Sequence, residues 1–108
     1  MLCENILSKS EKEVLSVIYD SAETLSLQGV QALVNKKYHH EWKQQTVSTF
    51  LRRAVKKGYL EDYQEGRHVF YSPVVEKSVA LKNDLINLTY IYFNGDTDKM
   101  KKFVKTEL

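Results

Sequence analysis

Residues 43–58 read Lys43-Gln-Gln-Thr-Val-Ser-Thr-Phe-Leu-Arg-Arg-Ala-Val-Lys-Lys-Gly58. The spacing predicts a helix that begins around Gln44 and ends before Gly58, because glycine readily adopts the backbone conformation that closes a helix. Apolar residues fall on one face of this helix, and hydroxyls, amides and arginines occupy the other sides. Such a helix buries the apolar face and presents the polar side outward. The apolar face consists of Val47, Phe50, Leu51 and Ala54.

Two further helices are expected on the N-terminal side of this stretch. The first follows two overlapping capping boxes, in which serine and glutamate side chains satisfy free backbone N–H groups, and it reaches about Asp20. The second is capped by a serine and ends near Tyr38. The capping residues are Ser8 with Glu11 or Ser10 with Glu13 for the first helix, and Ser26 for the second.

A short β-hairpin is expected directly after the central helix. Residues 60–63 and 68–72 have the composition of strands, and Glu65-Gly66 forms the turn between them. Pro73 closes the second strand because it lacks a backbone donor.

Helical spacing returns from Val74 onwards. The first of two C-terminal helices ends at Asn94-Gly95-Asp96, and Thr97 or Asp98 is expected to cap a short last helix. The first of these two helices carries an apolar stripe that is larger than one short helix can hide on a small domain, so we expect the stripe to be buried between two chains. The alternative is that this helix folds back on the preceding domain of its own chain. The stripe consists of Leu81, Leu85, Leu88, Ile91, Tyr92 and Phe93.

The predicted fold is mostly α with a small β wing. Three helices followed by a hairpin are typical of a winged helix-turn-helix domain, expected here over residues 1–73. A helical dimerisation region is expected over residues 74–108.

Composition excludes several classes of protein. The 108 residues are 43% hydrophobic, which is ordinary for a globular chain, and no apolar run approaches the length of a membrane span. The N-terminus lacks the pattern of a signal peptide, so a cytoplasmic location is expected. The single cysteine, Cys3, excludes an internal disulfide framework. We expect no cofactor and no enzymatic activity, because no nucleophile with a base, phosphate-binding glycine loop or metal-ligand spacing is present.

The charge distribution points to a nucleic acid partner. Residues 36–68 hold eight Lys/Arg against four Asp/Glu, whereas the remainder holds eight against ten. A basic centre is what phosphate binding requires. A major groove accepts an α-helix, and amides, hydroxyls and arginines match the donor and acceptor patterns of base edges. The same pattern also fits a merely solvated helix face, or a winged helix that binds another protein.

Candidate DNA-binding residues follow from their places on the central helix and hairpin. The N-terminal half of such a helix faces the bases, and the basic residues are placed for phosphates, which position the protein without reading sequence. Base contacts are expected from Gln44, Gln45, Thr46, Ser48 and Thr49, phosphate contacts from Lys43, Arg52, Arg53 and Lys56, and backbone or minor-groove contacts from Arg67 and His68 at the hairpin tip.

His39 and His40 stand next to Glu41, which raises the alternative of a metal site. Adjacent loop residues rarely share one ion without further donors, so a position on the loop surface is predicted for them.

Three separated motifs resemble the penicillinase-repressor family of β-lactamase, methicillin-resistance and copper-transport repressors. They are residues 7–15, which read Leu-Ser-Lys-Ser-Glu-Lys-Glu-Val-Leu, residues 46–60, and residues 65–73, which read Glu-Gly-Arg-His-Val-Phe-Tyr-Ser-Pro. The resemblance covers nearly all of residues 6–105 with the elements in the same order.

The resemblance implies a dimeric winged-helix repressor that binds inverted repeats with half-sites related to TACA and TGTA. The family's wing corresponds to residues 65–68, and its dimerisation helices correspond to residues 74–93 and the last segment. Its recognition-helix contacts correspond to Gln45, Thr46, Ser48, Thr49 and Arg53.

Two features differ from branches of that family. In the β-lactamase branch a regulatory protease cuts an Asn-Phe bond in the final helices, and the matching bond here is Lys102-Phe103. The copper branch carries a C-terminal cluster of cysteines that bind metal, and this chain has none there. Metal sensing by that route is therefore not expected.

Overall fold

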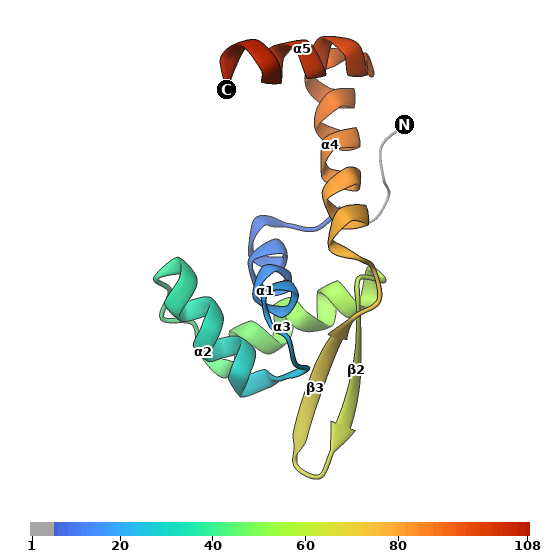
Figure 1. Cartoon of the computed structure of the whole chain (residues 1–108). Helices are drawn as coiled ribbons and strands as arrows, with labels where there is room; N and C mark the ends of the chain where they lie inside the picture. Colours follow the sequence, from blue (N-terminus) through green and yellow to red (C-terminus); the bar gives the residue numbers. More distant parts are fainter. Residues whose placement is uncertain (1–5) are drawn as a thin grey trace. The chain divides into compact units, whose positions relative to one another are not determined.

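This computed structural model describes residues 6–108, which divide into two units. Leu7–Glu76 form the larger unit, and Lys77–Leu108 form the helical part of the other. Cys3 lies outside the described residues. The larger unit contains α1 (Lys9–Asp20), β1 (Leu25–Ser26), α2 (Leu27–Tyr38), α3 (Gln44–Lys56), β2 (Leu60–Glu65) and β3 (His68–Pro73), and the second contains α4 (Lys77–Phe93) and α5 (Thr97–Glu107) (Figure 1).

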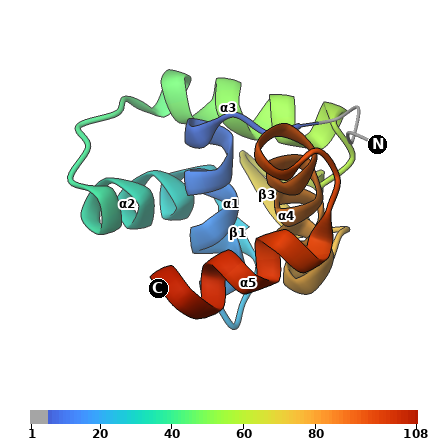
Figure 2. The same ribbon diagram turned by 90° about the horizontal axis from the view of Figure 1, so that it is seen from above.

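The predicted fold class is confirmed for these elements. Helices α1, α2 and α3 pack against one another (Figure 2), and the hairpin of β2 and β3 extends from the same unit (Figure 1). Strand β3 lies between β1 and β2 in a three-stranded antiparallel sheet. Strand β1, at two residues, is too short for its alternation to be recognised in the sequence.

Helix α1 begins with one of the two expected capping boxes. The Glu11 backbone N–H donates to Ser8 Oγ at 3.2 Å, and the Ser8 N–H donates to Glu11 Oε1 at 3.1 Å. The alternative box that starts at Ser10 is not used, because Ser10 lies inside α1. Capping by Ser26 is confirmed for α2, where its Oγ accepts from the Gly29 N–H at 3.1 Å.

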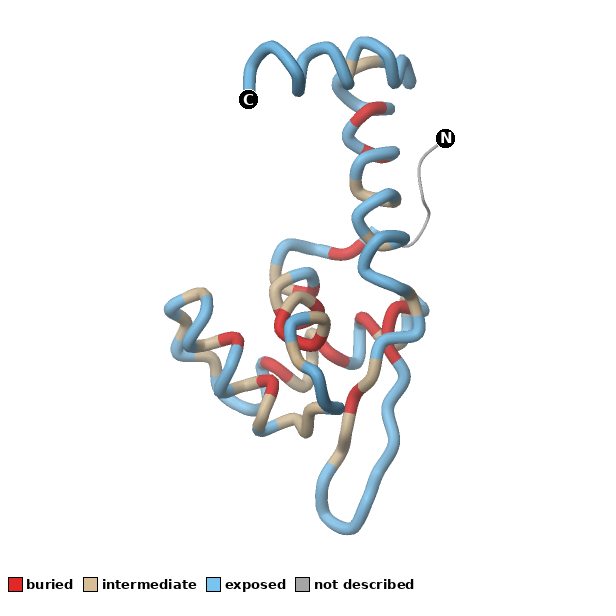
Figure 3. The backbone as a smooth tube through the Cα atoms, in the orientation of Figure 1, coloured by how far each residue is buried: buried red, intermediate tan, exposed pale blue. Residues whose placement is uncertain are grey.

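The core of the larger unit lies where the three helices and the base of the sheet meet. Buried segments gather on the inner sides of α1, α2 and α3, whereas the far end of the hairpin is exposed (Figure 3). Burying such side chains supplies the main free energy of folding, at about 25 cal/mol per Å² of apolar area. Fully or almost fully buried apolar side chains include Val14, Val30, Val34, Val47, Leu51 and Tyr71.

A buried carboxylate joins the start of α1 to the end of α3. Glu11 is 2% exposed and accepts a hydrogen bond from Lys57 Nζ at 2.6 Å, in addition to its bond from Ser8. Burial alone would raise the pKa of Glu11, but the ammonium of Lys57 and the Ser8 N–H outweigh it and hold the pKa below its ordinary value. Lys57 is the C-cap of α3, so the ion pair fixes the end of that helix against α1.

Within the second unit, the loop between the helices ends α4 as expected, but the cap of α5 differs from the prediction. Asn94 and Gly95 have positive φ angles of 50° and 82°, which stops the helix. Asp96, not Thr97 or Asp98, is the N-cap, and its side chain accepts from the Lys99 N–H at 3.1 Å. An aspartate one residue earlier can reach the free N–H groups of the first turn without giving up its own extended backbone.

None of the helices within residues 6–108 combines the length and the apolar content that crossing a lipid bilayer requires.

Replacing Glu11 by Gln should lower the free energy of unfolding at pH 7 by about 1–3 kcal/mol, because Lys57 loses its charged partner. A depressed folded-state pKa stabilises the protein above the unfolded pKa, about 4.3 for Glu, and this contribution is lost as pH falls through the folded value. The gap between wild type and Glu11→Gln should therefore shrink between pH 7 and pH 3 in urea titrations. The exposed Glu41→Gln is the matched control and should change stability by less than about 0.5 kcal/mol. A pH-independent gap would exclude this role for the ion pair.

Candidate nucleic-acid interface

Helix α3 has one fully buried face and one free face. Val47, Leu51 and Ala54 are 0% exposed. At 100° per residue, the direction opposite to them is occupied by Gln45, Thr49, Arg52 and Lys56. Packing therefore uses the apolar side of α3 and leaves a continuous polar side available to a partner.

The structure brings the predicted α3 residues to this side or to its flanks. Thr46 and Arg53 share one flank, and Gln44 and Ser48 share the other. Thr49 and Ser48 are half-buried, and the Thr49 hydroxyl donates to the Gln45 carbonyl at 3.0 Å. The exposed candidates are Lys43, Gln44, Gln45, Thr46, Arg52, Arg53 and Lys56 on or beside α3, with Arg67 and His68 on the hairpin.

Positive charge is concentrated along α3. Residues 43–57 contain five basic residues and no acidic one. Lys57 turns inward to Glu11, whereas Lys43, Arg53 and Lys56 make no ion pair with any other described residue. These three cations are thus available to an anionic partner.

The hairpin is more acidic than its tip suggests. Arg67 lies at the tip, but β2 carries Glu61, Asp62 and Glu65, all exposed. The register places Glu65 opposite His68, so a carboxylate stands beside the predicted contact residue. The attraction for phosphate is therefore centred on α3, and the hairpin can add to it only through its tip.

The outer face of the hairpin carries an aromatic pair. Tyr63 and Phe70 lie opposite each other, and their rings stack at a centroid distance of 5.5 Å. Tyr63 remains 47% exposed. The other face of the hairpin holds the buried Leu60 and Tyr71, which pack on the helical core.

The turn between α2 and α3 contains an arrangement that the sequence analysis missed. His39 is exposed and has a positive φ of 58°, as the C-cap of α2. His40 lies in the same loop and is half-buried, because its ring stacks on Trp42 at a centroid distance of 3.9 Å and its Nε2 lies 2.9 Å from Glu13 Oε1. The signal available in the sequence was the aromatic spacing Tyr38, His40 and Trp42. Within residues 6–108, no three His, Cys, Asp or Glu side chains cluster closely enough to hold a metal ion.

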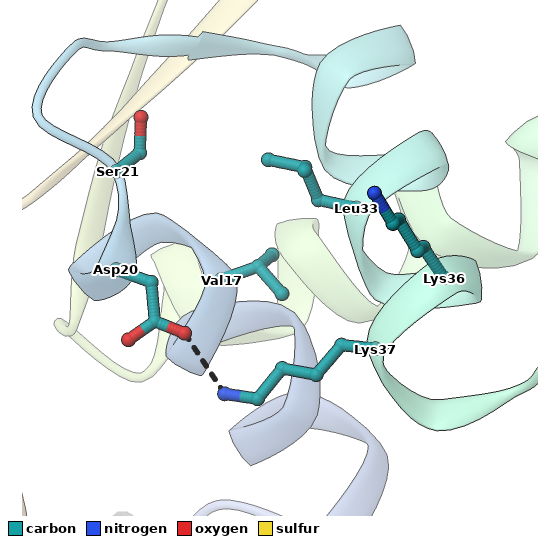
Figure 4. A pocket seen from close by; sticks show the side chains of 6 residues that line it. All are labelled: Val17, Asp20, Ser21, Leu33, Lys36 and Lys37. Atoms are coloured by element: carbon teal, nitrogen blue, oxygen red, sulfur yellow. Dashed lines mark hydrogen bonds and ion pairs between the residues drawn. The ribbon is translucent and has the colours of Figure 1, made fainter.

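A hollow of about 560 Å³ lies between the C-terminal halves of α1 and α2 (Figure 4). The Lys37 Nζ donates to Asp20 Oδ2 at 2.9 Å along one side of it, and this bond raises the pKa of Lys37. Because both side chains are largely exposed, the pair contributes less than about 1 kcal/mol. The hollow is lined by Val17, Asp20, Ser21, Leu33, Lys36 and Lys37.

The second unit exposes apolar side chains and buries polar ones. In α4 the buried residues are Asn87 and Thr89, whereas Ile91 is 60% and Tyr92 is 76% exposed. A groove of about 600 Å³ runs between α4 and α5. Its lining contains four of the predicted dimerisation residues and four from the α5 side, namely Leu85, Leu88, Tyr92, Phe93, Met100, Phe103, Val104 and Leu108.

The family model described as Penicillinase repressor matches residues 7–107. The chain belongs to the penicillinase repressor family. It is 27% identical to the penicillinase repressor of Bacillus licheniformis over 94 residues, which cover 87% of this chain and 71% of that protein. It is 30% identical over 79 residues, 73% of this chain, to an uncharacterized 16.5 kDa protein in the ptsI 3' region of Latilactobacillus sakei. The matched part spans about half of that protein, 52%.

Solved structures of the penicillinase repressor family and of one further protein share the fold. The monomeric form of Bacillus licheniformis BlaI, in complex with the blaP half-operator, is 31% identical with a TM-score of 0.56. The match covers 72% of this chain and 92% of that one. RosR of H. salinarum, at 22% identity and a TM-score of 0.63, matches 92% of this chain and 88% of its own, which supports the fold alone.

Replacing Arg53 by Ala should change the free energy of unfolding by less than about 0.5 kcal/mol, because its side chain is exposed and makes no ion pair in the described chain. Leu51→Ala should cost about 2–5 kcal/mol, because it opens a cavity at a fully buried position. Urea titrations of both variants test whether folding depends on the buried apolar side of α3 and not on its exposed polar side. A large loss from Arg53→Ala would show that the outer face is needed for folding and is not free for a partner.

Proposed function

We propose that this chain is a homodimeric transcriptional repressor that binds an inverted-repeat operator through α3. The observation that carries the proposal is the polar side of α3, which is basic, free of acidic residues over residues 43–57, and not used for packing. Membership of the penicillinase repressor family supports it, as does the half-operator complex of the related BlaI.

In this proposal α3 lies in the major groove. Gln44, Gln45 and Thr46 in its first turn face base edges, followed by Ser48 and Thr49. The Thr49 hydroxyl must give up or share its bond to the Gln45 carbonyl in order to donate to a base. Phosphates are bound by Lys43, Arg52, Arg53 and Lys56, which set the register of the helix on the duplex.

The hairpin approaches DNA by its tip. Arg67 and His68 can meet the phosphate backbone or minor groove, whereas the carboxylates of β2 are repelled by it. This charge pattern restricts the orientations in which the domain can bind. It favours those that hold β2 away from the duplex.

The second unit supplies the dimer contact. The exposed stripe of Leu81, Leu85, Leu88, Ile91 and Tyr92 and the groove beside α5 are apolar surface that water disfavours. Burial against a second copy contributes about 25 cal/mol per Å² before the costs of association. A two-fold dimer then presents two α3 helices to two half-sites of opposite orientation.

A regulatory protease is a further proposed partner. The Lys102–Phe103 bond lies within α5, and both side chains are exposed. An extended backbone is needed in a protease active site, so α5 must unwind locally before cleavage.

The deciding experiment is a titration of the full chain onto a labelled duplex with a TACA/TGTA-type inverted repeat and onto a scrambled duplex, at two salt concentrations. We expect tight, salt-sensitive binding to the repeat with two chains per duplex. Equally weak binding to both duplexes would call for a second experiment, in which preferred sites are selected from a random duplex library. If no selected site is bound more tightly than the scrambled duplex, the chain does not recognise an operator.

The second candidate function is a winged helix that binds another protein. The Tyr63–Phe70 pair on the hairpin favours it, because Tyr63 is exposed and aromatic side chains are enriched in protein interfaces. Absence of any salt-dependent DNA binding would favour this function, whereas steep salt dependence favours the repressor.

Arg53→Ala should weaken binding to operator and scrambled duplexes by a similar factor, because a phosphate contact carries no sequence information. The slope of log K against log salt should fall by about one. The charge-neutral Gln28→Ala, exposed on α2, is the comparison variant. Unchanged affinity and slope for Arg53→Ala would remove Arg53 from the interface.

Leu88→Glu should convert the dimer to a monomer, because it places an unpaired carboxylate in an apolar interface. We expect the dimer dissociation constant to rise on the order of a hundredfold in sedimentation experiments. Lys82→Glu introduces the same side chain at an exposed polar position of α4 and should leave the dimer intact. If both variants dimerise like the wild type, the interface lies elsewhere.

A further inference from the structure

The start of α3 is not held by a cap of its own. Lys43 is the N-cap and makes no side-chain capping bond, whereas Ser8, Ser26 and Asp96 cap α1, α2 and α5. A helix whose first turn lacks such a bond frays more readily at that end. The proposed base-reading residues lie in this turn, so another part of the molecule must fix it.

Asn35, in the last turn of α2, holds the residue immediately before that cap. Its Nδ2 donates to the Trp42 carbonyl at 3.0 Å, and its Oδ1 accepts from the Trp42 N–H at 3.1 Å. Both backbone groups of Trp42 are thus bound by one side-chain amide. Gln31 Nε2 adds a second bond to the same carbonyl at 3.1 Å.

The near side of the turn is tied to Asn35 as well. The backbone N–H groups of His39 and His40 both donate to the Asn35 carbonyl, the latter at 3.1 Å. Asn35 therefore binds the turn where it leaves α2 and again where it enters α3. Both ends of the turn between α2 and α3 are therefore bound to the same residue.

Aromatic contacts connect the turn to α3. The Trp42 ring stacks on the His40 ring at a centroid distance of 3.9 Å, and its centroid lies 5.0 Å from that of the Phe50 ring in α3. His40 is bonded to Glu13 of α1 at 2.9 Å. Trp42 is thereby linked to all three helices.

We propose that Asn35 is a positioning residue for DNA reading, which sets the start and rotation of α3 without touching DNA. This rests on the proposed function of α3. Each residue turns the helix by about 100°, so a shift of its first turn would point Gln44, Gln45 and Thr46 away from the base edges. Phosphate contacts by long, flexible lysines and arginines tolerate such a shift far better than base contacts.

The test compares Asn35→Ala, Gln31→Ala and Ser8→Ala with the wild type on operator and scrambled duplexes. Ser8→Ala is the matched control, because it removes a helix cap from the same domain without touching the turn. For Asn35→Ala we expect the operator-to-scrambled affinity ratio to fall about tenfold, the size of one lost base contact, with little change on scrambled DNA. Gln31→Ala should lower the ratio less, and Ser8→Ala should leave it unchanged. Circular dichroism and thermal melts establish that each variant is folded at the assay temperature.

A second readout is independent of DNA. Trp42 is the single tryptophan of the chain, so its fluorescence reports the turn directly. Acrylamide should quench it more strongly in Asn35→Ala than in Ser8→Ala. If Asn35→Ala does not fold, Gln31→Ala carries the same test, with a reduced ratio and increased quenching as the expected result.

The outcomes separate this proposal from the proposed function. A wild type that fails to distinguish operator from scrambled DNA, whatever site is selected, overturns the function and this role together. A wild type that discriminates, beside an Asn35→Ala variant with the same ratio, overturns the positioning role alone. A ratio lowered equally in Asn35→Ala and Ser8→Ala also overturns it, because general destabilisation then explains the loss.

Discussion

The Glu11–Lys57 ion pair joins the start of α1 to the end of α3 through a buried carboxylate. A carboxylate that is almost fully buried is costly unless it is paired and hydrogen-bonded. Glu11 meets this requirement only when the start of α1 lies against the end of α3. The hairpin follows α3 directly through Gly58, whose positive φ of 86° ends the helix. The pair therefore holds the end of α3, from which the hairpin starts, against the start of α1.

Folding and the proposed recognition use different sides of the same helix. Val47, Leu51 and Ala54 are sequestered in the core, so the outward residues can change with little effect on stability. The second unit shows the reverse pattern, since its apolar residues are the exposed ones. The larger unit has its own apolar core, whereas the described helices of the second unit leave apolar side chains exposed, so the proposed DNA contact and the proposed dimer contact lie in separate units.

The elements could be predicted because their signals are local. Helical spacing, serine caps and the glycine after α3 depend on residues a few positions apart, and those helix limits agree with the structure. One error was also local. The cap of α5 is Asp96, at least one residue earlier than predicted, and periodicity does not resolve single residues. For the same reason the sequence left the choice between Ser8 and Ser10 open, and the structure has Ser8 as the cap of α1. Strand β1 was missed because its pairing with β3 brings together residues about 45 positions apart in the chain.

The helix pattern, the family resemblance and the polar composition of α3 follow from neighbouring residues, so the amino-acid sequence was enough to predict them. Which cations are paired, and which residues bind the start of α3, depend on contacts between distant parts of the chain. Lys57 counts as basic in the sequence, yet it is committed to Glu11, 46 residues away. In the sequence His40 is an ordinary turn residue and Asn35 an ordinary helix residue, until folding brings Glu13 against the first and the Trp42 backbone against the second. Pairings of this kind depend on distances that exist only once the helices have packed.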